Sequence, residues 1–319
     1  MTANVRILIT GGNGYVGRAL TRQLYDQHDV AVVDSLRHEE LRFSEKEVSA
    51  FSLYRIDIRD YDALAQVFAE VNPELVIHLA AIHYIPECEA CPDEAISINS
   101  LGTANVMRAC ASDVGLVFVS TVAVYAPQEA PHVEGVSPVG PMDIYGLTKL
   151  HAEQYVEYWA KAKGLRAAII RLSNVIGPGE TNAHLLPAIL AQLLKGKRTL
   201  RLGNCYPRRD YIDVADAANG IEVIALGLAE RTGVDVVNLG TGASHSVYDV
   251  VEVLSEVIGE RLTIESDPAR VRASDRPFLT ASVEKVQRKY GWSPKLTLVD
   301  SLRVLWRDPD IPSELLERS

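Results

Sequence analysis

The sequence predicts an α/β fold in which a doubly wound parallel sheet is joined to a smaller α/β part. Three observations lead to this expectation. Apolar segments of strand length alternate with helical patterns up to about residue 172, a glycine-rich stretch follows the first apolar segment, and polar residues stand where later apolar segments end. Alternating strands and helices imply a parallel sheet, and ligands bind beyond the carboxyl ends of such strands.

Composition narrows the function classes. The chain has 319 residues, of which 47% are hydrophobic and 23% charged, and its formal net charge is -10. The acidic balance and the lack of a basic run argue against a nucleic-acid-binding surface. No apolar run approaches the ~18 residues of a membrane span, and the first ten residues lead directly into a strand pattern without a signal peptide. We therefore expect a cytoplasmic protein that binds neither nucleic acid nor membranes.

The first strand pattern, at residues 5–9, leads into the sequence TGGNGYVG. Its glycines are Gly11, Gly14 and Gly17, and a helix pattern follows at residues 18–27. Glycine allows a tight turn and a close approach of the backbone to a pyrophosphate, which binds the free amides at a helix N-terminus. A glycine triplet is also common in ordinary turns, but its place between a first strand and a helix predicts a Rossmann-type dinucleotide site.

Asp34 ends the second strand pattern, at residues 30–33, about 20 residues beyond the glycines. An acid at this spacing holds ribose hydroxyls in a dinucleotide fold and repels a 2′-phosphate, so it favours NAD over NADP. Arg37 lies close by and weakens this preference slightly. The alternative is that Asp34 is only a turn residue at the end of a strand.

The rest of the first half continues the alternation. The predicted strands are residues 51–56, 75–81, 116–119 and 166–172, and the predicted helices are residues 61–71, 92–111 and 144–163. Residues 75–81 are apolar nearly throughout, as in a strand covered on both faces. Asp34, Ala80, Thr121 and Ser173 all fall at strand ends, so we expect them at one edge of the sheet.

The second half is less regular. It shows helix patterns at residues 185–195, from 213 to about 230, and at 247–258, 283–290 and 298–306, with short strands at 200–203, 234–239 and 261–265. We predict a nucleotide-binding domain at residues 1–172 and a substrate domain at 173–319, with some return of the chain to the sheet and a cleft between the two parts.

A hydroxyl, a phenol and an amine form the candidate catalytic group. Thr121 follows the strand at residues 116–119, and Tyr145 and Lys149 are four residues apart on a predicted helix, which places them on one face. A free phenol has a pKa near ~10. A neighbouring ammonium favours the phenolate and moves that pKa toward neutrality, so the pair is suited to taking a proton from an alcohol.

Cys88 and Cys91 form a single CxxC, with His78 and His83 shortly before it. A second CxxC, which would complete a zinc site, is not present. We therefore interpret both cysteines as reduced and predict no metal, although a metal or redox role is the alternative.

Together these features resemble the extended short-chain dehydrogenase/reductase family over nearly the whole chain, and within it nucleotide-sugar enzymes similar to UDP-galactose and UDP-glucose 4-epimerase. The stretches that carry the resemblance are TGGNGYVG at 10–17, DIRD at 57–60, HLAA at 78–81, STVAVY at 120–125, YGLTK at 145–149, RLSNVIGPG at 171–179, RRDYIDVAD at 208–216 and GWSPKLTLVDSLR at 291–303.

The resemblance implies roles for individual residues. Thr121, Tyr145 and Lys149 would be catalytic, with Tyr145 as the acid/base. The residues assigned to NAD are Gly11, Gly14, Tyr15, Val16, Gly17, Asp34, Ser35, Leu36, Asp57, Ile58, Leu79, Ala80, Ala81, His83, Asn99, Tyr145, Lys149 and Ser173. The residues assigned to a nucleotide-diphosphate sugar are Thr121, Tyr145, Asn174, Arg209, Arg272 and Asp275. An arginine suits this task because its guanidinium pairs with phosphate oxygens, although an ordinary surface ion pair is the alternative for Arg209 and Arg272.

Departures from the family pattern refine the expected reaction. Dehydratases and decarboxylating relatives carry acids after the threonine, whereas this chain has Val122 and Ala123. At three positions where family members often contact the sugar, this chain has His184, Leu202 and Leu279. The identity of the sugar therefore does not follow from the resemblance. The resemblance implies epimerisation at carbon 4 through a 4-keto intermediate in a homodimeric enzyme. A nucleotide-sugar reductase, dehydrogenase or dehydratase and a non-catalytic NAD-binding regulator are the alternatives.

Overall fold

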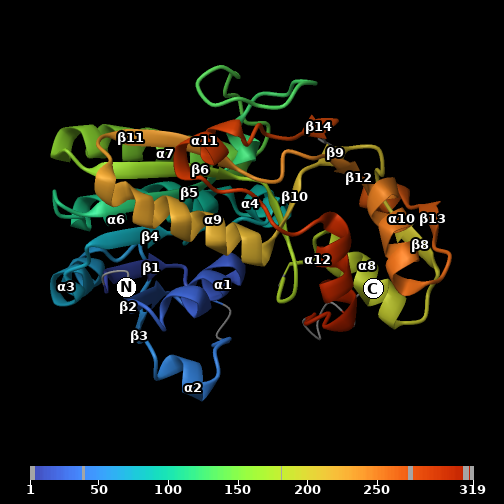
Figure 1. Ribbon diagram of the computed structural model, residues 1–319, viewed down its shortest axis with the longest axis horizontal. Helices are drawn as coiled ribbons and strands as arrows, with labels where there is room; N and C mark the ends of the chain where they lie inside the picture. The colour runs from blue at the N-terminus through green and yellow to red at the C-terminus, as the bar shows by residue number, and fades with distance from the viewer. Residues whose placement is uncertain (1–3, 38–39, 181, 272–275, 312–315, 317–319) are drawn as a thin grey trace.

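The computed structural model describes residues 4–37, 40–180, 182–271, 276–311 and 316, and its centre is a parallel Rossmann-type sheet (Figure 1). The strand order is β11-β6-β5-β4-β1-β2-β3. The strands are β1 (Arg6–Thr10), β2 (Asp29–Asp34), β3 (Ser52–Arg55), β4 (Leu75–His78), β5 (Gly115–Thr121), β6 (Arg166–Leu172) and β11 (Val234–Leu239). The order changes direction beside β1, which is where this class of sheet binds its ligands.

Helices cover both faces of the sheet, as Figure 1 shows. On one face α1 (Tyr15–Leu24) packs against α9 (Val214–Leu226), and on the other α6 (Thr103–Ala109) lies between α3 (Tyr61–Val71) and α7 (Ile144–Lys163). Each face has its own cluster of buried apolar side chains. The strands are therefore covered on both sides, and their nearly continuous apolar sequences follow from this burial.

The smaller part of the molecule is built around a third apolar cluster. It contains α8 (Leu185–Leu194), α10 (Val247–Ile258), α12 (Leu298–Arg307) and three small sheets (Figure 1). The sheets pair β7 (Asn174–Ile176) with β10 (Tyr211–Asp213), β8 (Thr199–Leu202) with β13 (Thr263–Ser266), and β9 (Arg208–Arg209) with both β12 (His245–Ser246) and β14 (Phe278–Leu279). The helix α11 (Glu284–Tyr290) returns to pack on β11.

Two predicted elements differ in the structure. The strand predicted at residues 75–81 ends at His78, because the chain then passes over Gly11, where an added Cβ would lie 2.6 Å from the Ala80 nitrogen. The helix predicted at residues 92–111 is divided into α5 (Pro92–Ile96), a π-helical segment η1 (Ser97–Gly102) and α6. The side chain of Asn99 in η1 bonds to Ile82 and Thr148, and π-helical insertions of this kind are frequent at functional sites.

Four short helical segments were not predicted from the sequence. These are α2 (Glu45–Val48), α4 (Ile85–Ala90) and the 3-10 turns η2 (Val122–Val124) and η4 (Pro268–Arg270). Each has fewer than two full turns, which is too short for a hydrophobic period to be recognised. None of the described helices is long and apolar enough to cross a membrane.

Candidate active site

A cleft of about 1170 Å³ runs along the carboxyl ends of the sheet strands toward the smaller part of the molecule. Nearly all of the predicted site residues that the structure describes line it, including Gly11, Asp57 and Arg209. Asn99 is the exception, because its buried side chain lies behind the wall of the cleft. Arg272 and Asp275 lie outside the described residues.

The glycine loop fits the pyrophosphate of a dinucleotide. The helix α1 begins after Gly14, and no side chain caps its first amides. Gly11 has a positive φ of 74°, and a Cβ added at Gly17 would lie 2.1 Å from the Gly11 carbonyl oxygen. Larger residues at these positions would clash with the backbone of the turn. The glycines therefore permit the turn, and they leave backbone N–H groups available to an anion.

Asp34 lies beside this loop at the end of β2. Its carboxylate accepts hydrogen bonds from the backbone N–H groups of Asn13, at 3.0 Å, and Leu36, at 2.9 Å. Arg37 forms ion pairs with Glu87 and Glu94. Because both acids neutralise this guanidinium, it is poorly placed to attract a 2′-phosphate, and the negative charge of Asp34 governs the preference for NAD.

Asp57 and Ile58, which the family resemblance assigns to the adenine of NAD, line one end of the cleft. Arg59 forms a bidentate hydrogen-bonded pair with Asp57, and these bonds lower the pKa of that carboxyl. Ile58 is buried and contacts Gly102, where an added Cβ would lie 2.4 Å from the Ile58 Cδ1 atom. This end of the cleft therefore offers an apolar contact beside a charged rim, which suits a flat heterocycle.

Tyr145 and Thr121 meet at the centre of the cleft. Tyr145 lies in the first turn of α7, where Asp143 caps the helix by accepting the Gly146 N–H at 2.7 Å. Thr121 is the last residue of β5, and its hydroxyl accepts the Ala123 N–H at 3.1 Å. The Thr121 hydroxyl is near enough to the phenol to favour its charged form. Two hydroxyl groups are thus held together at the carboxyl end of the central strands.

The electrostatics of this pair differ from the sequence prediction. The pKa of Tyr145 is raised, chiefly because burial disfavours the phenolate, although Thr121 acts in the opposite direction. Burial also lowers the pKa of Lys149 to about 7. The predicted lowering of the Tyr145 pKa is therefore wrong, because burial disfavours the charged forms of both groups.

Buried polar side chains support the strand that carries Thr121. Ser120 donates a hydrogen bond of 2.6 Å to Glu153, which also accepts two bonds from Arg171. On the other side of the site, Asn99 accepts the Ile82 N–H at 2.8 Å and donates to the Ile82 carbonyl at 2.9 Å. Asn99, which the resemblance assigns to NAD, therefore positions the Ile82 segment of the cleft wall.

The far end of the cleft has more arginines than sequence reasoning identified. Arg209, on β9, donates to the Arg276 carbonyl at 2.7 Å, and Asn174 lines the same end. Arg270 and Arg276 also line the cleft. Arg276 is buried and donates to the carbonyls of residues Ala123 and Tyr125, at 2.8 and 2.5 Å. Its sequence context carried no signal for this role, because its partners are about 150 residues away.

The CxxC cysteines are free thiols, as predicted. Cys88 is buried, Cys91 is exposed, and burial raises the pKa of Cys88 to about 12. His78 is buried between the hydroxyls of Thr10 and Thr103, and burial lowers its pKa to about 3. His78 is therefore engaged in a structural contact rather than poised near the thiols.

The family model for the NAD dependent epimerase/dehydratase family matches residues 7–240. The chain belongs to this family, and its cofactor is NAD. Among similar proteins, UDP-glucose 4-epimerase of Corynebacterium glutamicum is 32% identical over 312 residues, covering 92% of each chain. GDP-6-deoxy-D-mannose reductase of Pseudomonas aeruginosa is 27% identical and covers 95% of this chain and 96% of its own.

Solved structures show the same architecture. UDP-glucose-4-epimerase from Stenotrophomonas maltophila, with bound NAD and formylated UDP-arabinopyranose, has a TM-score of 0.85 at 28% identity, covering 95% of this chain and 97% of its own. UDP-glucose 4-epimerase from Bifidobacterium longum, in complex with NAD+ and UDP, has a TM-score of 0.84 at 26% identity, covering 95% and 99%.

Proposed function

We propose that this protein is an NAD-dependent epimerase that inverts carbon 4 of a nucleotide-diphosphate sugar, with a UDP-sugar as substrate. The observation that carries the proposal is the meeting of Thr121 and Tyr145 in the cleft that also contains the glycine loop and Asp34. The similarity to UDP-glucose 4-epimerases over most of the chain supports the choice of substrate.

In the proposed reaction Tyr145 takes the proton of the sugar 4-hydroxyl, while Thr121 holds the same oxygen. NAD, when bound, accepts the hydride from carbon 4 and returns it. Arg209 and Asn174 hold the diphosphate, so that the flat 4-keto sugar can turn about this anchor and expose its other face. Tyr145 then returns the proton. Lys149 would hold the nicotinamide ribose and, in its charged form, would favour the phenolate.

The residues after Thr121 support epimerisation over elimination. Val122 and Ala123 line the cleft and carry no group that can give or take a proton. A dehydratase needs an acid to expel a hydroxyl, and these two positions directly after Thr121 supply none. A non-catalytic regulator is disfavoured because the Tyr145 and Lys149 pair is present in the cleft.

A nucleotide-sugar reductase or dehydrogenase is the second candidate. The similarity to GDP-6-deoxy-D-mannose reductase favours it. The test is incubation of the purified protein with a panel of UDP-, GDP- and dTDP-sugars, with NMR of the products and absorbance of NADH. Epimerisation gives the carbon-4 epimer with no net NADH. Net formation or consumption of NADH would instead establish the second candidate.

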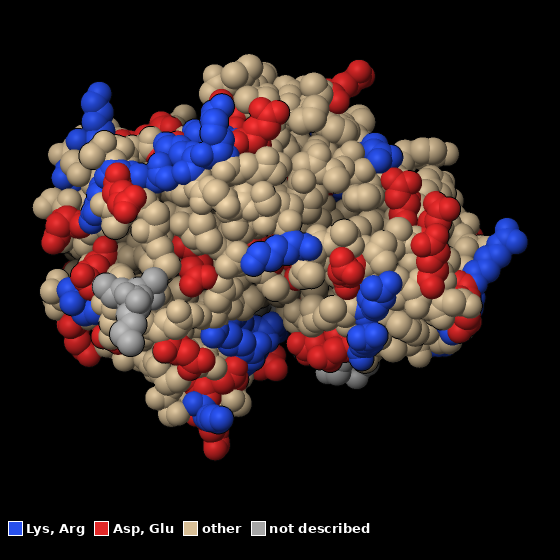
Figure 2. Space-filling model, viewed as in Figure 1, with Lys and Arg blue, Asp and Glu red and all other residues tan. Residues whose placement is uncertain are grey.

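The proposed division of labour is an NAD-binding domain at residues 1–172 and a substrate domain at 173–319, with β11 lying in the first domain's sheet. The mixed distribution of acidic and basic side chains in Figure 2 supports the absence of a nucleic-acid partner. We place the enzyme in the cytoplasm, because its cysteines are free thiols, as is usual in a reducing compartment. Cell fractionation with an antibody against the chain tests this location.

A homodimer is part of the proposal. Leu147, Tyr155 and Tyr158 are exposed on one face of α7, and Ile96 and Leu101 are exposed on the adjoining α5 and η1. A contiguous exposed apolar patch of this kind marks an association surface. Sedimentation of the wild-type protein should give a dimer, whereas Tyr158→Glu should shift it to a monomer. Tyr206→Glu, which changes an exposed tyrosine outside this face, should leave the dimer intact.

A further inference from the structure

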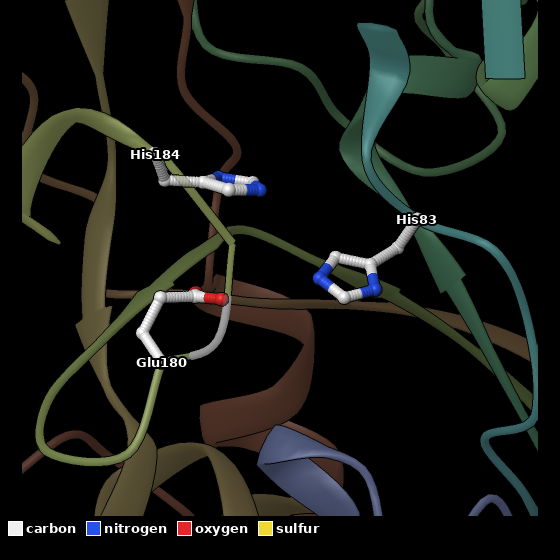
Figure 3. Close-up of side chains that lie close together, drawn as sticks. All are labelled: His83, Glu180 and His184. Carbon is white, nitrogen blue, oxygen red and sulfur yellow. The ribbon is translucent and has the colours of Figure 1, made fainter. Parts of the chain in front are cut away.

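Three side chains with metal-binding atoms converge inside the cleft. They are His83, Glu180 and His184, and one ligand atom from each lies within 4.8 Å of the other two. Figure 3 shows His83 reaching from the segment after β4 toward Glu180 and His184, which come from the segment between β7 and α8. His83 is exposed, His184 is half-buried, and Glu180 is only 8% exposed. The group therefore joins two opposite walls of the cleft.

The donor set is selective. Two imidazole nitrogens and one carboxylate form the protein ligands of zinc sites that keep a position open for water or substrate. Magnesium and calcium prefer oxygen ligands alone, so they fit these donors poorly. With neutral imidazoles the group carries one negative charge, which complements a dication. We propose that His83, Glu180 and His184 bind a divalent transition-metal ion, zinc by its donor set, with open coordination positions facing the cleft.

The geometry requires a modest closure. Zinc with nitrogen ligands at about 2.0–2.1 Å holds tetrahedral ligand atoms about 3.3 Å apart. The ligand atoms of the three side chains now lie up to 4.8 Å apart. To bind zinc they must therefore approach one another by up to about 1.5 Å. His83 can supply this movement because it is the exposed member of the three, and its contact with Asn182 then changes. The rings of His83 and His184 are already neighbours, with centroids 5.8 Å apart.

Neighbouring side chains are placed to orient the two histidines. The Asn182 side-chain nitrogen lies 3.2 Å from the His83 Nε2 atom and holds the ring in its present orientation. An ion bound through this ring nitrogen would take the place of the Asn182 contact. Tyr84 packs against His184, with ring centroids 5.3 Å apart. The inference goes beyond the proposed function, because epimerisation by Tyr145 needs no metal.

The test is a titration of the chelator-treated protein with Co2+, followed by its visible d–d absorption. We expect one Co2+ per chain, displaced by one equivalent of Zn2+. His83→Ala and His184→Ala should each weaken Co2+ binding by at least about 10-fold, since even the loss of an outer partner costs this much. His151→Ala, which removes an exposed histidine on α7, is the matched control and should bind as the wild type does. No stoichiometric binding, or binding unchanged in both cleft variants, overturns the proposal.

Melting temperatures distinguish a variant that has lost its metal site from a variant that does not fold. An ion that binds only the folded state raises the melting temperature. Zinc should therefore raise the Tm of the wild type and of His151→Ala, and it should leave His83→Ala unchanged. Because the exposed His83 side chain contributes little to packing, this variant should melt at the wild-type temperature without zinc. These readouts involve no turnover, so their failure is distinguishable from failure of the epimerase assay.

Discussion

The ammonium nitrogen of Lys149 lies 4.2 Å from the centre of the Phe118 ring. The aromatic face gives a favourable cation–π contact, yet the side chain is only 2% exposed and burial lowers the pKa of Lys149 to about 7. Loss of hydration therefore outweighs the local attraction. Near neutral pH this lysine stands between its charged and neutral forms, so binding of an anionic cofactor can restore its charge.

The first prediction concerns stability and pH. The pKa of Lys149 is lower in the folded state, about 7, than the ~10.4 of an exposed lysine. Below pH 7 both states are protonated, and folding bears the full cost of the buried charge. Between pH 7 and about 10 the unfolded chain binds the extra proton, so this cost falls as pH rises. Lys149→Met should therefore raise the Tm at pH 6.5, with a gain that shrinks by pH 9.5.

Thermal melts across this pH range check that prediction, with Lys161→Met on the exposed side of α7 as the control. The control should follow the wild type at every pH. A Tm difference for Lys149→Met that stays constant from pH 6.5 to 9.5 would show that the lysine does not change its protonation on folding.

The second prediction concerns the acid/base. Tyr145→Phe keeps the ring but removes the hydroxyl that lies beside Thr121 in the cleft. We expect the rate of epimerisation to fall ~100 to 10,000-fold, because the sugar hydroxyl then loses its proton acceptor. NAD binding, measured by calorimetry, should change little. A variant that binds NAD and still turns over at near the wild-type rate would falsify the assigned role.

The third prediction concerns cofactor choice. Asp34→Asn removes the charge that would pair with ribose hydroxyls, and hydrogen bonds to charged groups contribute about 1.5–3 kcal/mol. NAD affinity should therefore fall about 10- to 100-fold, while NADP, no longer repelled, should gain relative to NAD. Calorimetry with both cofactors measures the ratio. Asp26→Asn, at an exposed position, is the control. An unchanged ratio in Asp34→Asn would count against the assignment.

The fourth prediction concerns the glycine loop. In Gly17→Ala the new Cβ would lie 2.1 Å from the Gly11 carbonyl oxygen, so the backbone must shift. We expect a loss of about 1–3 kcal/mol in the free energy of unfolding, as for other overpacked sites, together with weaker NAD binding. Gly115→Ala is the matched control, because its nearest neighbour would be a Leu75 side-chain carbon at 3.4 Å. Denaturant unfolding should separate the two variants, and equal stabilities would contradict the steric argument.

The fifth prediction concerns the buried ion pair behind Thr121. Glu153→Gln leaves the Arg171 guanidinium without its carboxylate in a nearly dry environment. Breaking a buried pair in this way costs about 3–5 kcal/mol, so the midpoint of denaturant unfolding should fall clearly. Glu157→Gln, one turn along α7 and exposed, should have a small effect. Equal decreases in the unfolding midpoint of the two variants would show that the buried ion pair contributes no more to stability than an exposed glutamate.

Local patterns predicted much of the fold. The helix at residues 144–163 has the predicted limits, because an Asp143 cap and a Gly164 end bound it in the sequence itself. The order of strands in the sheet was not readable. β11 pairs with β6 although about 60 residues separate them. Such a pairing depends on which edge of the sheet is exposed once the other elements have packed, and the sequence does not show this.

The sequence by itself determined the alternation of strands and helices, the glycine loop with Asp34, and the spacing of Tyr145 and Lys149, because each depends on neighbours within one or two elements. Only the tertiary structure decided the direction in which the Tyr145 and Lys149 pKa values move, the anchoring of Arg276 on the turn after Thr121, and the meeting of His83 with Glu180 and His184. Burial and distance between remote segments set these properties, and a linear pattern contains neither quantity.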